Sequence, residues 1–283
     1  MELLQHKKKN ALIVVEGERL ESEFFKWFTK AYDIGMEICV VGGNIYELYK
    51  KMQEYHFEAD IKDVLLETGN HVPGTEAQLR QNFTYTYLVF DFDAHHREYN
   101  EQELDIDTVV QNNIKRLMEL TAFFTNETDP TIGRLYINYP MMESFRDCSD
   151  FWDDTYAENT VKIEEIGDYK RIAGQKRLAS RHLSSYSQDR FSSLSKMNVY
   201  KLNMLNSGCW NELSYEQYLD LSQGSAILAR QQEMTSTERK VYVINTSLFL
   251  MLDYFGNRDG FYDSVVMQFA SKEDQKEAIL QPV

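Results

Sequence analysis

Proline and cysteine are scarce in this chain of 283 residues. Four prolines exclude long proline-rich linkers, and the isolated Cys39, Cys148 and Cys209 form neither a CxxC pair nor a Cys/His zinc motif. A reduced, cytoplasmic setting is therefore expected. Long apolar runs are also missing, because the stretches 11–15 and 241–254 are both too short to span a bilayer. We expect no membrane segment, and we interpret 241–254 as a buried helix.

Positive charge is also in short supply: 30 Lys and Arg residues stand against 45 Asp and Glu residues, a net charge of −15. The electrostatic field of such a negative charge disfavours binding to a polyanionic partner. Eight basic residues nevertheless gather between 169 and 201, where the only acid is Asp189. This basic segment is either a solvated loop and helix face or a local phosphate-binding surface. Its candidates for nucleic-acid binding are Lys170, Arg171, Lys176, Arg177 and Arg181.

Strand and helix signals alternate along the chain up to about residue 150. Apolar and β-branched runs predict four buried strands, at 11–15, 36–41, 83–92 and 135–139. Helical spacing predicts helices at 22–32, at 108–124 and, after an N-cap at Asn44, through Leu48, Met52 and Tyr55. Strands that alternate with helices imply parallel βαβ units with helices on both faces of the sheet.

Beyond residue 150 the pattern becomes mainly helical, with helices expected at 215–232 and 240–254 and only weak strand signals. We therefore predict an α/β fold with a parallel sheet flanked by helices and a mainly helical C-terminal half. Residues 1–150 would form the sheet-bearing domain, and 151–283 a helical domain or extension that carries the basic segment 169–201. The two parts could share one core.

Acidic residues follow three of the four predicted strands. Glu16 comes after the first strand and before Gly17, which lets the chain turn sharply. Asp91 and Asp93 close the third strand, and Glu143 lies just past the fourth. Because chemistry in parallel sheets gathers at the carboxyl ends of the strands, we expect these carboxylates to lie near one another.

The pair Asp91 and Asp93 is the most specific of these motifs. Strand alternation places both side chains on one side, where two carboxylates repel each other unless Mg²⁺ or Mn²⁺ lies between them. Glu21, in the first turn of the next helix, is a less certain addition. Adjacent His95 and His96 usually point apart, and His95 is the better candidate for a catalytic base, against a plain loop role.

These motifs resemble the TOPRIM family, and most of all its OLD-type and RloB-like nuclease branch. The resemblance rests on EGERLE at 16–21, on DFD at 91–93, and on NYPMMES at 138–144, which is similar to an Asn-Pro-x-x-Glu element with one residue inserted. It covers roughly residues 10–150, and nothing comparable reaches the second half. In topoisomerases and primases a third acid often follows the Asp-x-Asp pair, and here that place is taken by His95.

The resemblance implies a TOPRIM-like fold in which Glu16, Asp91, Asp93 and, as a further candidate, Glu21 bind Mg²⁺ or Mn²⁺. Glu143 and His95 are further catalytic candidates. It also implies an endonuclease that cleaves DNA or tRNA, acting as a toxic effector in bacterial anti-phage defence (abortive infection) with an ATPase or sensor protein as partner. Such a protein would be cytoplasmic, and a homo-oligomer is left open.

Two other functions remain open. The Asp-x-Asp at 91–93 also resembles that of haloacid-dehalogenase-like phosphatases, but those enzymes carry the pair after their first strand. A non-catalytic interaction subunit with a TOPRIM-like fold is the other alternative. The sequence contains no P-loop, so any ATP dependence would come from another chain.

Overall fold

The computed structural model describes residues 11–68, 71–126, 129, 131–148, 154–176 and 181–267. At its centre is a five-stranded sheet of order β2-β1-β3-β5-β4, in which the first four strands are parallel and β4 is antiparallel to β5. The strands are β1 (Ala11–Val15), β2 (Glu37–Val40), β3 (Tyr85–Asp91), β4 (Thr125–Asn126) and β5 (Gly133–Asn138). The predicted α/β class is therefore confirmed, and each of the four expected strands is present.

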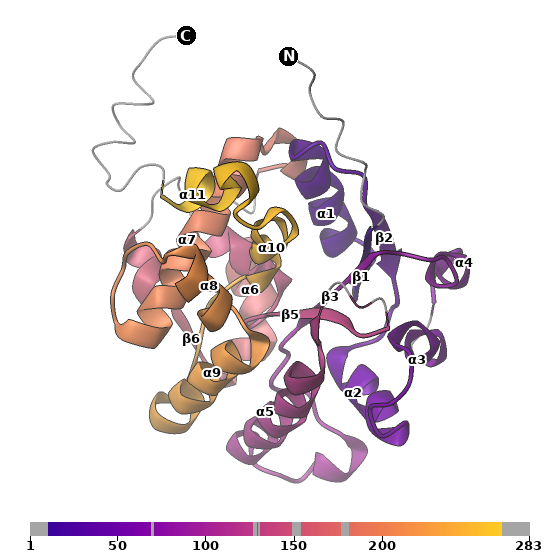
Figure 1. Cartoon of the computed structure of the whole chain (residues 1–283). Coiled ribbons are helices and arrows are strands. Elements are labelled where there is room, and N and C mark those ends of the chain that lie inside the picture. Colours follow the sequence, from indigo (N-terminus) through magenta and orange to yellow (C-terminus); the bar gives the residue numbers. More distant parts are fainter. Residues whose placement is uncertain are drawn as a thin grey trace, which may run out of the picture.

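Helices cover both faces of this sheet, as the alternating pattern predicts. They are α1 (Leu20–Ala31), α2 (Ile45–Glu54), α3 (Ile61–Glu67), α4 (Thr75–Leu79) and α5 (Ile106–Phe123). In Figure 1, α1 lies on one side of the strands, and α2 and α5 lie on the other. The predicted N-cap is confirmed, because the Asn44 side chain accepts the amides of Tyr46 and Glu47, both at 3.0 Å.

Two short helices that the sequence did not predict, α3 and α4, complete the N-terminal part. Helix α4 lies beside the edge strand β2 and donates side-chain hydrogen bonds to its carbonyl groups. The Thr75 hydroxyl donates to the Val40 carbonyl at 2.6 Å, and the Gln78 amide donates to the Ile38 carbonyl at 3.2 Å. These bonds occupy carbonyl groups that would otherwise be free to pair with another strand.

The C-terminal half is mainly helical, as expected. Its α-helices are α6 (Tyr169–Gly174), α7 (Gln188–Ser207), α8 (Tyr215–Leu221), α9 (Gly224–Glu238), α10 (Leu250–Phe255) and α11 (Phe261–Val266). The 3₁₀ turns used below are η2 (Met142–Asp147), η4 (Ile163–Asp168) and η7 (Thr246–Phe249). A small antiparallel ladder joins β6 (Thr160–Lys162) to β7 (Lys240–Tyr242).

The helices expected at 215–232 and 240–254 are both wrong in detail. The first is divided into two helices, since α8 ends at Leu221 with Ser222 as its C-cap, and α9 begins at Gly224. The second begins as strand β7 and becomes helical only in η7 and α10. Its first residues are rich in β-branched side chains, which favour a strand. Across the described ranges, no helix has the length and apolar character needed to cross a membrane.

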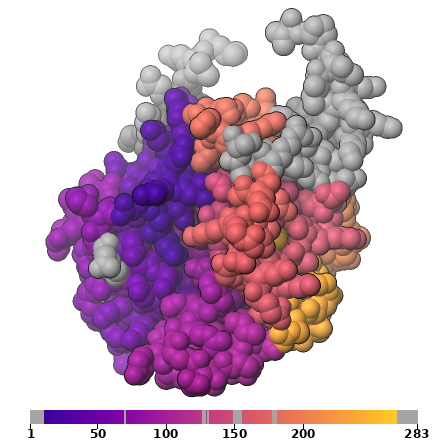
Figure 2. Space-filling view, turned by 180° about the vertical axis from the view of Figure 1, so that it is seen from behind, coloured from indigo at the N-terminus to yellow at the C-terminus, as the bar shows by residue number. Residues whose placement is uncertain are grey.

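A single hydrophobic core joins the two halves of the chain. Phe24 and Phe28 of α1 pack against Phe191 of α7, with ring centroids 5.6 and 5.0 Å apart. Just past β5, Tyr139 exchanges two backbone hydrogen bonds of 2.9 Å with Ile244. In the face shown in Figure 2, the surface of the first half adjoins that of the second directly. The division into domains 1–150 and 151–283 stays a prediction.

Candidate functional site

Five acidic side chains meet at the carboxyl edge of the sheet, and we call them the acidic group: Glu16, Glu21, Asp91, Asp93 and Glu143. Glu16 follows β1, Asp91 ends β3, Glu143 lies in η2 beyond β5, and Glu21 lies in the first turn of α1. Their negative charges act on one another, since the charges of the other four all raise the pKa of Asp91. The expected meeting of these residues is therefore observed, although their chemical roles stay predictions.

Glu16 is half-buried, and one of its carboxylate oxygens, Oε2, is shielded from solvent without a hydrogen-bond partner. Burial, followed by the charge of Asp93, raises the pKa of Glu16 to about 8, although a hydrogen bond with the Asp91 backbone opposes the rise. An unpaired buried oxygen on an ionisable group is costly. The carboxyl group therefore carries a proton near neutral pH unless a cation compensates its charge.

Asp91 is more deeply buried, with 5% of its surface exposed. Its Oδ1 accepts the backbone amide of Met142 at 2.7 Å, which links the end of β3 to η2. Burial, and then the charges of Glu16 and Asp93, raise the pKa of Asp91 well above its ordinary value of 3.8. So many carboxyl groups cannot all ionise at one buried edge without a positive charge among them.

Gly17 has a different role from the one expected. The sequence suggested that it allows a sharp turn, yet its backbone is not in the left-handed region that requires glycine. Instead, the Glu21 carboxylate folds back over Gly17, and a Cβ atom at this position would overlap with it. Burial, and then the charge of Glu143, raise the pKa of Glu21. The glycine therefore makes room for a carboxylate of the acidic group.

The expectation that strand alternation places Asp93 beside Asp91 is wrong. Strand β3 ends at Asp91, and Asp93 lies in the following loop with a φ of 36°, outside extended geometry. Its charge nevertheless acts on both Glu16 and Asp91. Asp93 therefore belongs to the acidic group through the conformation of the loop.

Two buried polar side chains, one from α2 and one from α5, hold this loop in place by hydrogen bonds. The Tyr46 hydroxyl donates to the carbonyl of Phe92 at 2.6 Å. The Asn113 amide donates to the carbonyls of Ala94 and His96 at 2.9 and 2.8 Å. Both residues were missed in the sequence; for Asn113 the available signal was a polar residue on a mainly apolar helix face.

The two histidines of the loop point apart, as expected. His96 stacks on the ring of Tyr46, with centroids 4.8 Å apart and planes inclined by 6°. His95 is exposed, and its ring lies close to Gly167 of η4. His95 is thus the histidine on the side of the loop that meets the C-terminal half, and its role as a base stays a prediction.

Lys170, in the basic segment, lies beside the acidic group, a position that the sequence did not reveal. It is the second residue of α6, which packs against η2. Burial lowers the pKa of Lys170, but the charges of Glu143, Asp91 and Asp93 outweigh this effect, and its pKa is raised. A cation therefore faces the clustered carboxylates.

The other described residues of the basic segment are divided between the exterior and the core. Arg171 pairs with Asp168 at 3.0 Å on the exterior, and the Lys176 ammonium lies 3.6 Å from the buried carboxylate of Asp147. Arg181 is exposed, and Arg177 lies outside the described residues. The basic residues that lie in the core with α7 are Arg190, Lys196 and Lys201. For the described residues of the segment, neither a continuous phosphate-binding surface nor a plain solvated helix face fits this arrangement.

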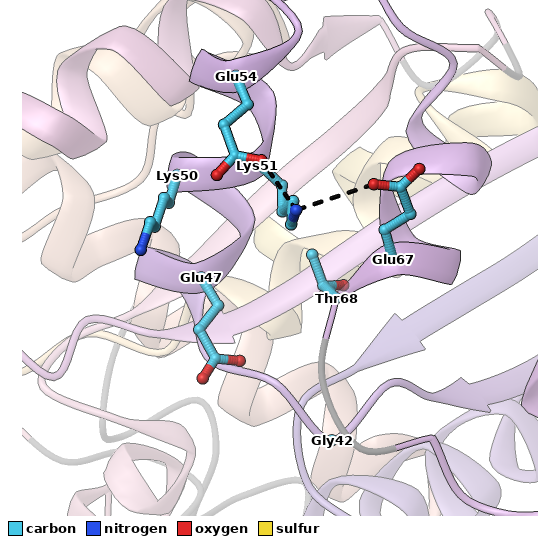
Figure 3. A pocket seen from close by; sticks show the side chains of 7 residues that line it. All are labelled: Gly42, Glu47, Lys50, Lys51, Glu54, Glu67 and Thr68. Carbon is cyan, nitrogen blue, oxygen red and sulfur yellow. Dashed lines mark hydrogen bonds and ion pairs between the residues drawn. The ribbon is translucent and has the colours of Figure 1, made fainter.

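A separate open pocket of about 440 Å³ lies between α2 and α3 (Figure 3). Three of its charged residues are paired: the Lys51 ammonium is 2.8 Å from Glu54 and 3.8 Å from Glu67. The lining residues are Gly42, Glu47, Lys50, Lys51, Glu54, Glu67 and Thr68. No member of the acidic group contributes to this pocket, so the two features are distinct.

In the part of the chain that the structure describes, no three Asp, Glu, His or Cys side chains form a ready-made metal-ligand set. Asp91 instead bonds to a backbone amide, and Glu21 covers Gly17. Comparison of the chain with protein-family models, curated proteins and solved structures finds no match.

Proposed function

We propose that this chain is a divalent-metal-dependent nuclease of TOPRIM type. The observation that carries the proposal is the gathering of five carboxylates at one edge of a parallel sheet, with raised pKa values at Glu16, Glu21 and Asp91. Such perturbed groups are typical of functional sites. The residue pattern of the motifs, which resembles that of the OLD-type and RloB-like branch, supports phosphodiester cleavage over other metal chemistry.

The residues present fit a hard divalent cation. Mg²⁺ and Mn²⁺ prefer carboxylate oxygens, and the unpaired buried oxygen of Glu16 is a donor that still lacks a partner. Glu16, Asp91, Asp93 and Glu21 would hold the ion after some of these side chains turn toward one another. When bound, such an ion activates water and stabilises the charge that develops on the phosphate.

The chain's own groups have defined tasks in this proposal. Glu16 would give up a proton when the site is loaded, because burial raises its pKa to about 8, and the raised pKa of Asp91 acts in the same direction. In this proposal Lys170 supplies a positive charge to the phosphate, and the exposed His95 acts as the base. Tyr46 and Asn113 keep the loop that carries Asp93 in place.

For the cellular role, we propose a cytoplasmic toxic effector of anti-phage defence that acts on DNA or tRNA with an ATPase or sensor partner. The net charge of −15 supports a chain that binds nucleic acid weakly until a partner positions it. The interaction-subunit alternative is favoured by one observation, namely that no ligand set is preformed among the described residues.

Cleavage of tRNA and plasmid DNA, assayed with Mg²⁺ or Mn²⁺ and with EDTA as the control, tests the proposal. The assay should include the product of the neighbouring gene, since partner dependence is part of the proposal. Cleavage that requires the metal supports a nuclease. Release of phosphate from a small phosphomonoester, without cleavage of nucleic acid, would favour the phosphatase alternative.

Metal affinity is expected to rise with pH. Glu16 has a pKa of about 8 without metal, so the ion must displace its proton below that pH. Between about pH 6 and pH 8 the Mn²⁺ affinity should rise by roughly tenfold or more, and it should level off above the pKa. Calorimetry in buffers of different ionisation enthalpy measures the released protons. Glu16→Gln should release fewer of them, and an affinity independent of pH would contradict the expectation.

A further inference from the structure

Lys170 lies between two parts of the candidate site, the turn η2 and the loop after β3. It follows η4 and the buried Tyr169, and α6 packs against η2, the turn that carries Glu143. On the other side, Gly167 of η4 approaches the ring of His95 in the loop after β3. The lysine is therefore flanked by the segments that carry Glu143 and Asp93.

The ammonium group of Lys170 faces these carboxylates without a direct ion pair to any of them among the described residues. This differs from its neighbours, since Arg171 pairs with Asp168 and Lys176 pairs with Asp147. The charge of Lys170 nevertheless interacts with those of all five members of the acidic group. Lys170 thus acts on the acidic group through its charge and not through a direct ion pair among the described residues.

We propose that Lys170 is an internal counter-ion that weakens metal binding until an anionic phosphate engages it. The inference rests on the proposed function, and it adds a regulatory property: metal and phosphodiester bind cooperatively. Without substrate, the lysine charge partly neutralises the carboxylates and repels an incoming divalent ion. A phosphate bound to the lysine removes that repulsion, and by reciprocity a bound ion strengthens phosphate binding.

The charge on Lys170 therefore has opposite effects on two ligands. Removing it should tighten Mn²⁺ binding by about three- to tenfold, as expected for one charge acting on a divalent ion across a partly exposed site. The same change should weaken the binding of a phosphodiester strand several-fold. Damage to the fold would weaken both ligands, so the opposite signs separate a counter-ion from a structural residue.

The experiment compares Lys170→Met with Arg171→Met, which removes a positive charge one residue away that is already paired with Asp168. Mn²⁺ affinity is measured by electron paramagnetic resonance, and the affinity for a phosphorothioate oligothymidylate by fluorescence anisotropy, with and without Mn²⁺. We expect Lys170→Met to bind Mn²⁺ more tightly and the oligonucleotide more weakly. Arg171→Met should leave Mn²⁺ binding unchanged, and Lys170→Arg should behave like the parent.

The outcomes distinguish this inference from the proposed function. If the parent chain binds Mn²⁺ and Lys170→Met binds it equally or less well, the counter-ion role is overturned while the metal site stands. If the oligonucleotide does not tighten Mn²⁺ binding in the parent, the cooperativity is overturned. If the parent binds no Mn²⁺ at all, the proposed function itself fails, and the inference fails with it.

Discussion

Asp91→Asn is expected to lose nearly all metal-dependent cleavage and to gain stability in the absence of metal. Asparagine keeps an oxygen that can accept the Met142 amide, so the link between β3 and η2 is preserved. The charge that attracts the ion is lost. Because a catalytic metal supplies several kcal/mol of transition-state stabilisation, the rate should fall at least about a thousandfold.

The gain in stability follows from the pKa of Asp91, which the fold raises well above 3.8. A carboxyl group with a raised native pKa binds more protons in the native state, so stability falls as the pH rises above about 4. Asparagine does not titrate, so in EDTA the melting temperature of the variant should exceed that of the parent at neutral pH. The difference should vanish in acid, below the pKa that Asp91 has in the unfolded chain.

The exposed Glu18, in the same turn as Glu16, offers a matched control. Glu18→Gln removes a negative charge without touching the buried group, and it should change neither cleavage nor stability appreciably. Circular dichroism and thermal melting establish that each variant folds. Cleavage by Asp91→Asn at the rate of the parent would refute a metal role for this edge of the sheet.

The sheet and its acidic edge were predictable from the sequence because each depends on local patterns. The runs around Val15 and Val89 are apolar and β-branched, and such runs become buried parallel strands. Once the strands are parallel, residues that directly follow them must share one edge. That is why Glu16, Asp91 and Glu143 meet although they are distant in sequence.

The remainder of the site depends on tertiary contacts that no local pattern encodes. Asp93 lies in a loop whose shape is imposed by Tyr46 and Asn113, two side chains from different helices. Lys170 comes from helix α6, far along the chain, and its approach to the edge follows from packing of α6 on η2. The apolar run after Lys240 became a strand because β6 was available to pair with it.

A second large effect is expected from Arg134→Met, which should destabilise the protein by about 3–5 kcal/mol. The Arg134 guanidinium on β5 lies 3.1 Å from the Asp253 carboxylate on α10, whose side chain is completely buried. The same carboxylate accepts the hydroxyls of Tyr136 and Tyr218 at 2.5 and 2.7 Å. Removing the arginine would leave a buried charge with hydrogen bonds but without its counter-charge.

Urea unfolding measures this loss, and the exposed pair of Arg80 and Glu76 is the control. Arg80→Met should cost less than about 1 kcal/mol, because solvent screens that pair. Adding Asp253→Leu to Arg134→Met should recover part of the lost stability.

The buried pair joins the sheet to the C-terminal half. If both halves depend on one core, the weakened protein should therefore still unfold in one transition. Two separate transitions would instead show that 1–150 and 151–283 fold as independent domains. If Arg134→Met lowers the free energy of unfolding no more than Arg80→Met does, the buried pair contributes little to stability.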